Sequence, residues 1–250
     1  MSFLRGGAAV ALRTLRKTWR RPVLLSFSLA QPLVWMLFFG FLFERFKVTG
    51  QERYLDFLAP GVCGMTVLFG ASQSGIGWIR DFQTGFLSRL AAAARGPHPL
   101  LAGKIAADVA RLVVQALLVL ALAFLLGFRP QLSLALVPAL LLLCLFGAAM
   151  SCLSSAFALR ARAQEAMAAY VHLCNMPLLF TSTALVPSRQ MPEWLASVAR
   201  FNPLSQAVDA WRAALLEGVP PGWSEAVPLL LLLALCYAWA AAELSRLRRG

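Results

Sequence analysis

Long apolar runs separated by short polar segments dominate the chain. Six runs carry no charged residue over about the length that a helix needs to cross a bilayer, roughly 20 residues. They lie at about 22–43, 57–79, 112–128, 132–159, 166–188 and 226–242. The pattern predicts an all-α polytopic membrane protein with six transmembrane helices. An even number of spans places both termini on the same side.

Composition supports the membrane class, and the charge distribution predicts the orientation. The chain is 60% hydrophobic and only 14% charged, against about 25% charged in soluble domains. Sixteen of the 23 lysines and arginines fall in the four segments 1–21, 80–111, 160–165 and 243–250. These alternate with the other connections and hold all of the net charge of +12, so they should face the cytoplasm. We expect a bacterial cytoplasmic (inner) membrane protein with both termini cytoplasmic. The basic residues are too dispersed for nucleic-acid binding and suit anionic membrane lipid.

The first 21 residues predict an amphipathic helix that lies in the cytoplasmic membrane interface. Its two faces, on a helical wheel, are Leu4, Ala8, Ala11, Leu12, Leu15 and Trp19 against Arg5, Arg13, Arg16, Lys17 and Arg20. An apolar face can sink into the acyl boundary while a basic face meets lipid phosphates. The same helix could simply anchor the first span.

The expected cytoplasmic loop 80–111 is too long for a minimal connection. Phe82, Phe86 and Leu90 recur every four residues, which predicts a short helix with one apolar stripe. Gly96-Pro97 then ends that helix. An apolar stripe on a polar loop needs lipid or a partner protein to cover it.

The expected outer segment 189–223 predicts two short amphipathic helices of re-entrant type before the sixth span at 224–242 and the tail at 243–250. Trp194, Leu195, Val198 and Phe201 form the first apolar face, and Val208, Trp211 and Leu215 form the second. Asn202 fits an N-cap, with Pro203 at the first helical position.

Sites for chemistry are absent from the sequence. There is no phosphate-binding loop of the Gly-x-x-x-x-Gly-Lys-Ser/Thr type, no catalytic constellation and no metal-ligand spacing. The predicted spans contain no Asp, Glu, Lys or Arg apart from Asp56 at a rim, which disfavours ion-coupled carriers. His172 and Asn175 form a polar pair on one face of the fifth span; they could join helices or line a substrate path. A transporter of this kind needs a separate motor.

Three ordered patterns carry a family resemblance. They are YLDFLAPG at 54–61; DFQTGFL at 81–87 leading to LLAGK at 100–104; and PLLFTS at 177–182 with MPEWL at 191–195 and NPL…DAWR at 202–212. In order and spacing the chain resembles permease subunits of ABC-2 type exporters, in particular the drug-resistance and nodulation-factor branch. The chain has Ala94 where many relatives have a proline, which leaves the shape of the cytoplasmic loop open.

The resemblance implies a single transmembrane domain over 1–250, with an N-terminal interfacial helix at 1–21, five spans within 22–188 and a coupling loop at 80–111. It implies a second permease copy in a homodimer and a separate ABC ATP-binding subunit that holds ATP-Mg, so this chain binds no cofactor. The ATPase-coupling residues would be Arg80, Asp81, Phe82, Gly85, Phe86, Arg89 and Leu90. The outer gate would use Pro192, Trp194, Asn202, Pro203, Asp209 and Arg212.

Under this interpretation the chain is a transport subunit without enzyme activity of its own, which exports an amphipathic drug-like or lipid-linked substrate. The spans are rich in Leu, Ala and Val rather than in the aromatic and polar groups that suit sugars, which weighs against the alternative of polysaccharide or lipopolysaccharide export. Two further alternatives are an ATP-independent carrier or channel and a membrane scaffold that transports nothing.

Overall fold

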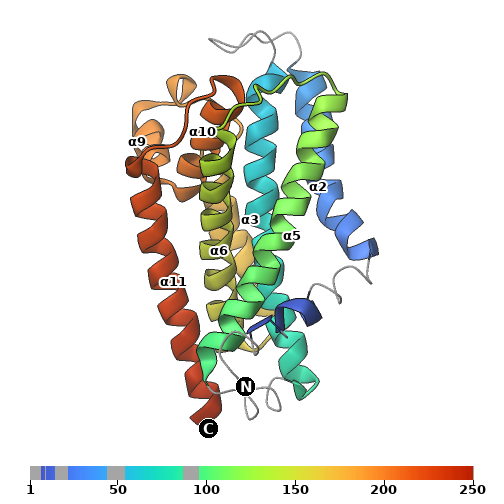
Figure 1. The fold of residues 1–250 in the computed structure, drawn as a ribbon, viewed down its shortest axis with the longest axis vertical. Helices are drawn as coiled ribbons and strands as arrows, with labels where there is room; N and C mark the ends of the chain where they lie inside the picture. The colour runs from blue at the N-terminus through green and yellow to red at the C-terminus, as the bar shows by residue number, and fades with distance from the viewer. Residues whose placement is uncertain (1–6, 9, 15–21, 44–53, 87–95, 250) are drawn as a thin grey trace.

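The computed structural model describes residues 7–8, 10–14, 22–43, 54–86 and 96–249, and every regular element in them is helical (Figure 1). The main helices are α2 (Pro22–Leu42), α3 (Tyr54–Gln83), α5 (Pro97–Leu125), α6 (Leu136–Ala161), α9 (Glu193–Phe201), α10 (Pro203–Leu216) and α11 (Trp223–Arg249). Between α6 and α9 lie α7 (Gln164–Tyr170), a π-helical turn (Val171–Asn175), α8 (Met176–Phe180) and a 3₁₀ turn (Ser188–Gln190). The predicted all-α class is confirmed.

Four of the described helices, α3, α5, α6 and α11, are long and apolar enough to cross a membrane. In α2 the described apolar stretch is the shorter Pro32–Leu42. The expected fifth span is divided among α7, the π-helical turn and α8. The total of six spans therefore stays a prediction.

Helix α5 differs most from the expected layout, because it begins at Pro97 and so includes much of the segment that was expected to be a cytoplasmic loop. Gly96 has φ of 128°, a conformation that suits glycine, and the prolines that follow fit a helix's first turn. Charged residues at 104, 108 and 111 stay in the helix because opposite charges three and four residues apart pair with one another. Much of the expected loop 80–111 is therefore helix, since α3 also continues to Gln83.

Helix α3 is the centre of the bundle. In its most apolar window 83% of the residues are buried, against 33% in α5 and α11. The helix is rich in glycine, alanine and serine, and small residues let neighbouring helices approach closely. It packs on α2, α5, α6 and α10, so α3 touches most of the elements that carry the sites described below.

The described parts of the four Lys/Arg-rich segments meet at one end of the bundle, which we call the basic end (Figure 1). Val10, Trp78, Leu100, Leu159 and Leu244 share one buried apolar cluster there. The opposite end holds α9 and α10. That the basic end faces the cytoplasm stays a prediction.

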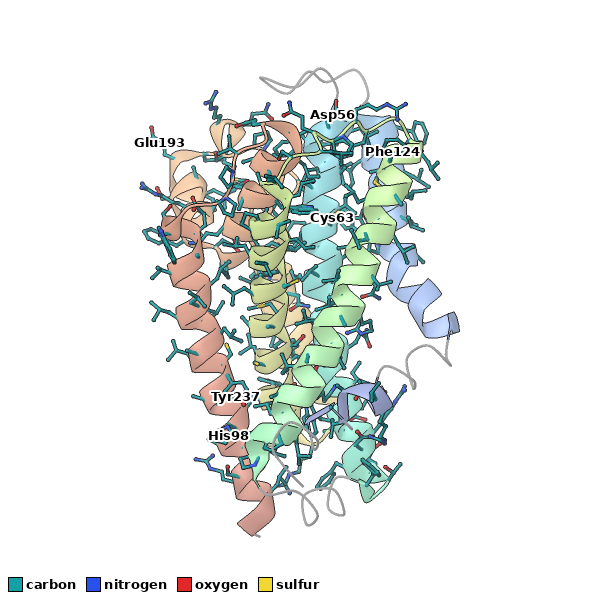
Figure 2. All side chains as sticks on the ribbon, viewed as in Figure 1. Asp56, Cys63, His98, Phe124, Glu193 and Tyr237 are labelled. Carbon is teal, nitrogen blue, oxygen red and sulfur yellow. The ribbon has the colours of Figure 1, made fainter. Side chains whose placement is uncertain are left out.

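A ring contact joins α5 and α11 at the basic end. The rings of His98 and Tyr237 stack with their centroids 5.9 Å apart, and Nδ1 of His98 lies 3.3 Å from the Tyr237 hydroxyl (Figure 2). His98, which stands between two prolines, therefore packs on a neighbouring helix.

The sides of the bundle are apolar and uncovered. Large exposed hydrophobic side chains include Val34, Phe38, Phe41, Leu117, Leu118, Leu231 and Leu235. Soluble monomers rarely expose so much apolar surface, whereas a lipid environment solvates it. The surface therefore supports the membrane assignment made from hydropathy.

Candidate functional site

The first candidate site is a contact between the N-terminal helix and the end of α3. The Arg13 guanidinium donates hydrogen bonds of 3.3 Å to both carboxylate oxygens of Asp81. It also lies 3.6 Å from the centre of the Phe86 ring. The side chain of Asp81 is only 15% exposed, so the bidentate pair is stronger than a surface ion pair. We call Arg13, Asp81 and Phe86 the basic-end platform.

The other predicted coupling residues lie around this platform. Arg80 is exposed, and the Phe82 ring is half-buried with the Arg162 guanidinium 5.2 Å from its centre. Gly85 adopts φ of 63° in the turn that ends α3, which favours glycine. Arg89 and Leu90 fall outside the described residues. The predicted stripe of Phe82 and Phe86 is thus partly covered by cations of this same chain.

Residues 7–8 and 10–14 also pack on α5, through a face that the helical wheel did not select. Val10 is buried, whereas Ala8 and Leu12 of the predicted apolar face are exposed. A Cβ atom on Gly103 would lie 2.3 Å from the carbonyl oxygen of Gly7. The N-terminal helix therefore depends on two glycines for its close approach to α5.

We predict that Gly103→Ala displaces the N-terminal helix. The added methyl group meets backbone, which cannot rotate away, and overpacking of this kind costs about 1–3 kcal/mol. Amide hydrogen exchange of residues 7–14 should rise about tenfold or more. Gly40→Ala is the matched control, since its Cβ would meet only Leu55 at 3.7 Å. Equal amide-exchange rates of these residues in the two variants would contradict the close packing of Gly7 on Gly103.

The second candidate site is a group of charged side chains between α3 and α5. Asp108 accepts hydrogen bonds from Ser74 Oγ at 2.5 Å and Lys104 Nζ at 3.1 Å, and Arg111 Nη2 lies 3.7 Å away. Side-chain exposure is 8% for Lys104, 5% for Asp108 and 11% for Arg111. Arg111 also donates to the carbonyl oxygen of Gly70 at 2.9 Å.

Serine and asparagine side chains extend this group toward α6 and the π-helical turn. Ser155 lies 3.1 Å from Ser74, and Ser154 donates to the carbonyl oxygen of Ser72 at 2.9 Å. Asn175 Nδ2 donates to Ser72 Oγ at 2.5 Å. We call the whole set the buried polar cluster; its members are Ser72, Ser74, Lys104, Asp108, Arg111, Ser154, Ser155 and Asn175.

The π-helical turn separates the two residues predicted to share a face. Asn175 is fully buried, whereas His172 is exposed. Bonding from residue i to i+5 widens the turn, so a side chain three positions on does not return to the same side. Only Asn175 joins the buried polar cluster, and its Oδ1 atom has no hydrogen-bond partner among the described residues.

Sequence reasoning missed the charged part of this cluster. It placed Lys104, Asp108 and Arg111 in a cytoplasmic loop and treated the spans as free of charge. The i, i+4 and i+7 spacing of alternating charge was the available signal, because such residues share one helix face. Buried charge within a membrane bundle marks a functional candidate.

The third candidate site lies at the opposite end, where Asn202 caps α10 as predicted. Its Oδ1 accepts from the backbone nitrogen of Leu204 at 2.8 Å, and Pro203 follows at the first helical position. Its Nδ2 donates to the Leu178 carbonyl oxygen at 2.7 Å and to Thr181 Oγ1 at 2.9 Å. One buried amide thus joins α10 to the end of α8.

Asp209 and Arg212 tie α10 to α3. Arg212 Nη1 donates to Asp209 Oδ1 at 2.5 Å and Nη2 to the Thr183 carbonyl oxygen at 3.0 Å. The guanidinium also lies 3.9 Å from the Phe57 ring centre and donates to that residue's carbonyl oxygen at 3.3 Å. Burial lowers the pKa of Arg212 from its ordinary value, and Asp209 opposes that shift. We call Phe57, Thr183, Asp209 and Arg212 the α10 clamp.

The two remaining predicted outer residues do not join this clamp. Pro192 precedes α9 and is exposed, and Trp194 is 68% exposed. Val198 and Phe201 on the same helix are also exposed. The predicted helix exists, but its apolar face is uncovered in the described chain.

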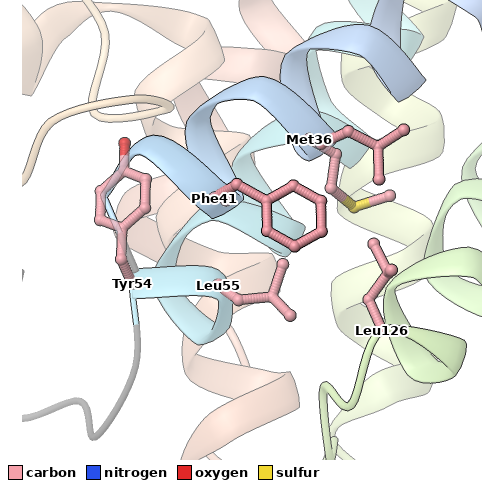
Figure 3. A pocket seen from close by; sticks show the side chains of 7 residues that line it. Met36, Phe41, Tyr54, Leu55 and Leu126 are labelled. Atoms are coloured by element: carbon pink, nitrogen blue, oxygen red, sulfur yellow. The ribbon is translucent and has the colours of Figure 1, made fainter. Parts of the chain in front are cut away.

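A hydrophobic cavity of about 100 Å³ lies between α2, α3 and the end of α5. Phe41 and Met36 of α2 converge there with Leu55 and Leu126 (Figure 3). Tyr54, at its edge, donates its hydroxyl to the Leu185 carbonyl oxygen at 2.8 Å. The lining offers apolar contact and no charged group.

Comparison with known proteins decides the family. The family model described as ABC-2 type transporter matches residues 8–216. The chain belongs to the ABC-2 type transporter family. The match includes all three candidate sites and ends before α11. Membership of this family implies a separate ABC ATP-binding subunit as partner.

Individual relatives of this ABC-2 chain are named as permeases. The chain is 31% identical over 210 residues to a transport permease, ycf38, of Pyropia yezoensis, covering 82% of this chain and 72% of the relative. It is 30% identical over 241 residues to the daunorubicin resistance ABC transporter permease protein DrrB1 of Streptomyces coeruleorubidus, covering 93% and 85%. The ABC-2 protein is accordingly a multi-pass membrane permease subunit of a transporter.

Proposed function

We propose that this permease belongs to an ATP-driven exporter that moves an amphipathic drug-like or lipid-linked substrate out of the cytoplasm or the inner leaflet. A separate subunit would hold ATP-Mg, and this chain would contribute no catalytic residue. Two permease copies would pair in a bacterial inner membrane with both termini cytoplasmic. The drug-resistance name of DrrB1 and the apolar cavity between α2 and α3 support an amphipathic cargo.

The observation that carries the proposal is the basic-end platform. Two segments expected to contact an ATPase, the N-terminal helix and the end of α3, are joined by the bidentate Arg13–Asp81 contact. An ATP-binding subunit that docks there would displace both segments together. Exposed Arg80 beside the platform offers a cation at the rim of such an interface.

Helix α3 could transmit a movement of the platform to the opposite end of the bundle. It runs without interruption from Tyr54 to Gln83, and the α10 clamp holds it at Phe57. A tilt of the basic end of α3 would therefore strain the contacts that Arg212 makes with Phe57 at the other end of the helix. We infer that ATP-driven movement of the platform opens the exit by releasing α10 from α3.

We predict that Arg13→Glu releases the ATP-binding subunit. The change sets two carboxylates against each other and removes the cation from the Phe86 ring. The amount of ATPase that copurifies from native membranes in mild detergent should fall roughly tenfold or more, the size of losing a charge-assisted pair at an interface. Arg189→Glu, an exposed arginine at the opposite end, is the matched control and should retain the ATPase.

A charge swap makes the test specific. Arg13→Glu combined with Asp81→Arg restores the pair in reverse and should recover the ATPase. Phe86→Asp is a poorer test, because the new carboxylate would offer Arg13 a second partner. Normal ATPase recovery with Arg13→Glu alone would exclude the platform as the docking surface. Substrate flux in liposomes without any ATPase would favour a carrier or channel, and ATPase binding without flux would favour a scaffold.

Polysaccharide export remains the alternative within the family. A sugar path needs polar and aromatic groups along the bundle. Among the described residues the aromatic contacts of α2 run from Trp35 through Phe39 to Phe43 and reach Tyr54, next to the cavity of Figure 3. Vesicle uptake assays with an amphipathic dye and with a lipid-linked oligosaccharide would separate the two cargoes.

A further inference from the structure

The buried polar cluster is unbalanced in charge. Lys104 and Arg111 are cations, Asp108 is the one anion that contacts them among the described residues, and each side chain is at most 11% exposed. The cluster therefore holds a net positive charge inside a membrane bundle. Burying an unpaired charge is unfavourable unless an opposite charge compensates it.

Hydrogen-bond donors are also in excess around these cations. The Lys104 ammonium can donate three hydrogen bonds, and Asp108 Oδ2 is its one acceptor among the described residues. Trp78, whose ring centre lies 5.7 Å from that ammonium, is 2% exposed, and its indole N–H has no partner in the described part of the chain. Unused donors beside an uncompensated cation suit an anionic oxygen group.

Among the described residues no acidic side chain other than Asp108 contacts these cations. Residues 1–31, 87–95 and 250 contain no Asp or Glu side chain. Glu44 and Glu52 fall in the link between α2 and α3, whose described ends lie opposite the basic end. Asp81 binds Arg13, and Glu243 binds Arg246 at 2.9 Å. An anion from another molecule would balance the cluster.

The cluster spans a range of depths, because Trp78 lies near the basic end with Lys104 beside Gly77, whereas Arg111 lies deeper in the bundle. Arg111 bonds to Gly70, which stands near the middle of α3 and thus about 20 Å from its basic end at 1.5 Å per residue. The flanking Ala110 and Val114 are exposed, so the α5 face beside Arg111 is open to the membrane. Bulk lipid phosphates lie at the bilayer surface, whereas an amphiphile that enters the bundle could carry its anionic group to this depth.

We propose that Lys104 and Arg111, with the Trp78 indole, form a binding site for the anionic oxygen group of a transported amphiphile: a phosphate, sulfonate or carboxylate. Asp108 holds both cations in place while the site is empty and competes with the ligand when it arrives. This assignment rests on the proposed function, since it names the charge class of that cargo.

The test measures binding to the full-length chain in uncharged detergent with two amphiphiles of equal chain length, dodecyl phosphate and dodecyltrimethylammonium. The wild type should bind dodecyl phosphate roughly tenfold more tightly or better. Arg111→Gln and Lys104→Gln should abolish that preference, whereas Arg111→Lys should keep most of it. Arg160→Gln, a 65% exposed arginine at the basic end, is the matched control and should bind as the wild type does.

Asp108→Asn gives a result of opposite sign, and Arg111→Lys, which keeps every charge of the cluster, covers the case in which a glutamine variant fails to fold. Removing the competing carboxylate should tighten dodecyl phosphate binding. Equal binding of both amphiphiles by the wild type, or unchanged preference in Arg111→Gln and Lys104→Gln, would overturn the site. A wild type that is dimeric and binds no dodecyl phosphate would also overturn the site, because the second copy would then supply the missing anion.

Discs of phosphatidylcholine with and without phosphatidylglycerol distinguish a bulk lipid from a cargo. Dodecyl phosphate binding should be similar in both. Full displacement by phosphatidylglycerol would overturn the assignment to a transported amphiphile. Binding needs no ATPase, so its failure leaves the Arg13→Glu copurification test of the proposed function untouched.

Discussion

Asp108→Ala should be the most destabilising single change in this protein. It removes the carboxylate on which Lys104 and Arg111 converge and leaves two buried cations without an anion. Breaking a buried ion pair in this way costs about 3–5 kcal/mol. The free energy of unfolding, measured by titration from mild detergent into dodecyl sulfate, should fall by that amount.

Two further variants show whether charge is the cause. Lys104→Met with Asp108→Ala removes one of the stranded cations and should recover part of the loss. Asp209→Ala is the matched single change, because it also strips a carboxylate from an arginine. The Asp209 side chain is 49% exposed, and Arg212, although buried, keeps its hydrogen bonds to the carbonyl oxygens of Phe57 and Thr183. The cost should therefore stay near 1 kcal/mol. Equal losses for Asp108→Ala and Asp209→Ala would refute the buried ion cluster.

Asn202→Ala should be the second large effect, and it should fall on α10 more than on the rest of the bundle. The amide caps α10 and also donates to Leu178 and Thr181. Loss of an N-cap costs about 1 kcal/mol, and leaving buried carbonyl and hydroxyl groups unpaired adds about 1–3 kcal/mol. We expect a loss of about 2–4 kcal/mol in the free energy of unfolding, with faster amide exchange in residues 203–216.

Asn202→Ser separates the two roles. Serine can cap the helix but lacks the second donor group, so this variant should recover only the capping part. If transport is impaired in Asn202→Ala while the ATPase still copurifies, the defect lies in the outer gate and not in assembly. A serine variant as stable as the wild type would show that the contacts to Leu178 and Thr181 contribute nothing.

The two sequence patterns that succeeded best are local ones. Asn202-Pro203 was expected to begin a helix and does, because an N-cap needs only the two or three residues that follow it. The helix at 193–201 was likewise expected from its apolar spacing. Asp81 and Phe86 were named as an interaction surface, yet their contact with Arg13 joins residues 68 positions apart, which no local pattern reveals.

The errors share one physical origin. Hydropathy marks a charged residue as outside a membrane span, and the expected cytoplasmic loop was therefore drawn as far as Arg111. In the folded chain Asp108 pairs with both cations at spacings of three and four residues, so the helix continues through them. Periodicity of 3.6 residues likewise paired His172 with Asn175, and the π-helical turn separated them.

The sequence by itself determined the helical membrane class, the clustering of basic segments at one end and the family, since these depend on composition, order and motifs. Tertiary structure alone decided that the N-terminal helix joins α3, that α10 is clamped to Phe57, and that Lys104, Asp108 and Arg111 are buried together. The reason is that hydropathy averages over neighbours in the chain. The balance of a buried charge depends instead on which distant side chain stands opposite it.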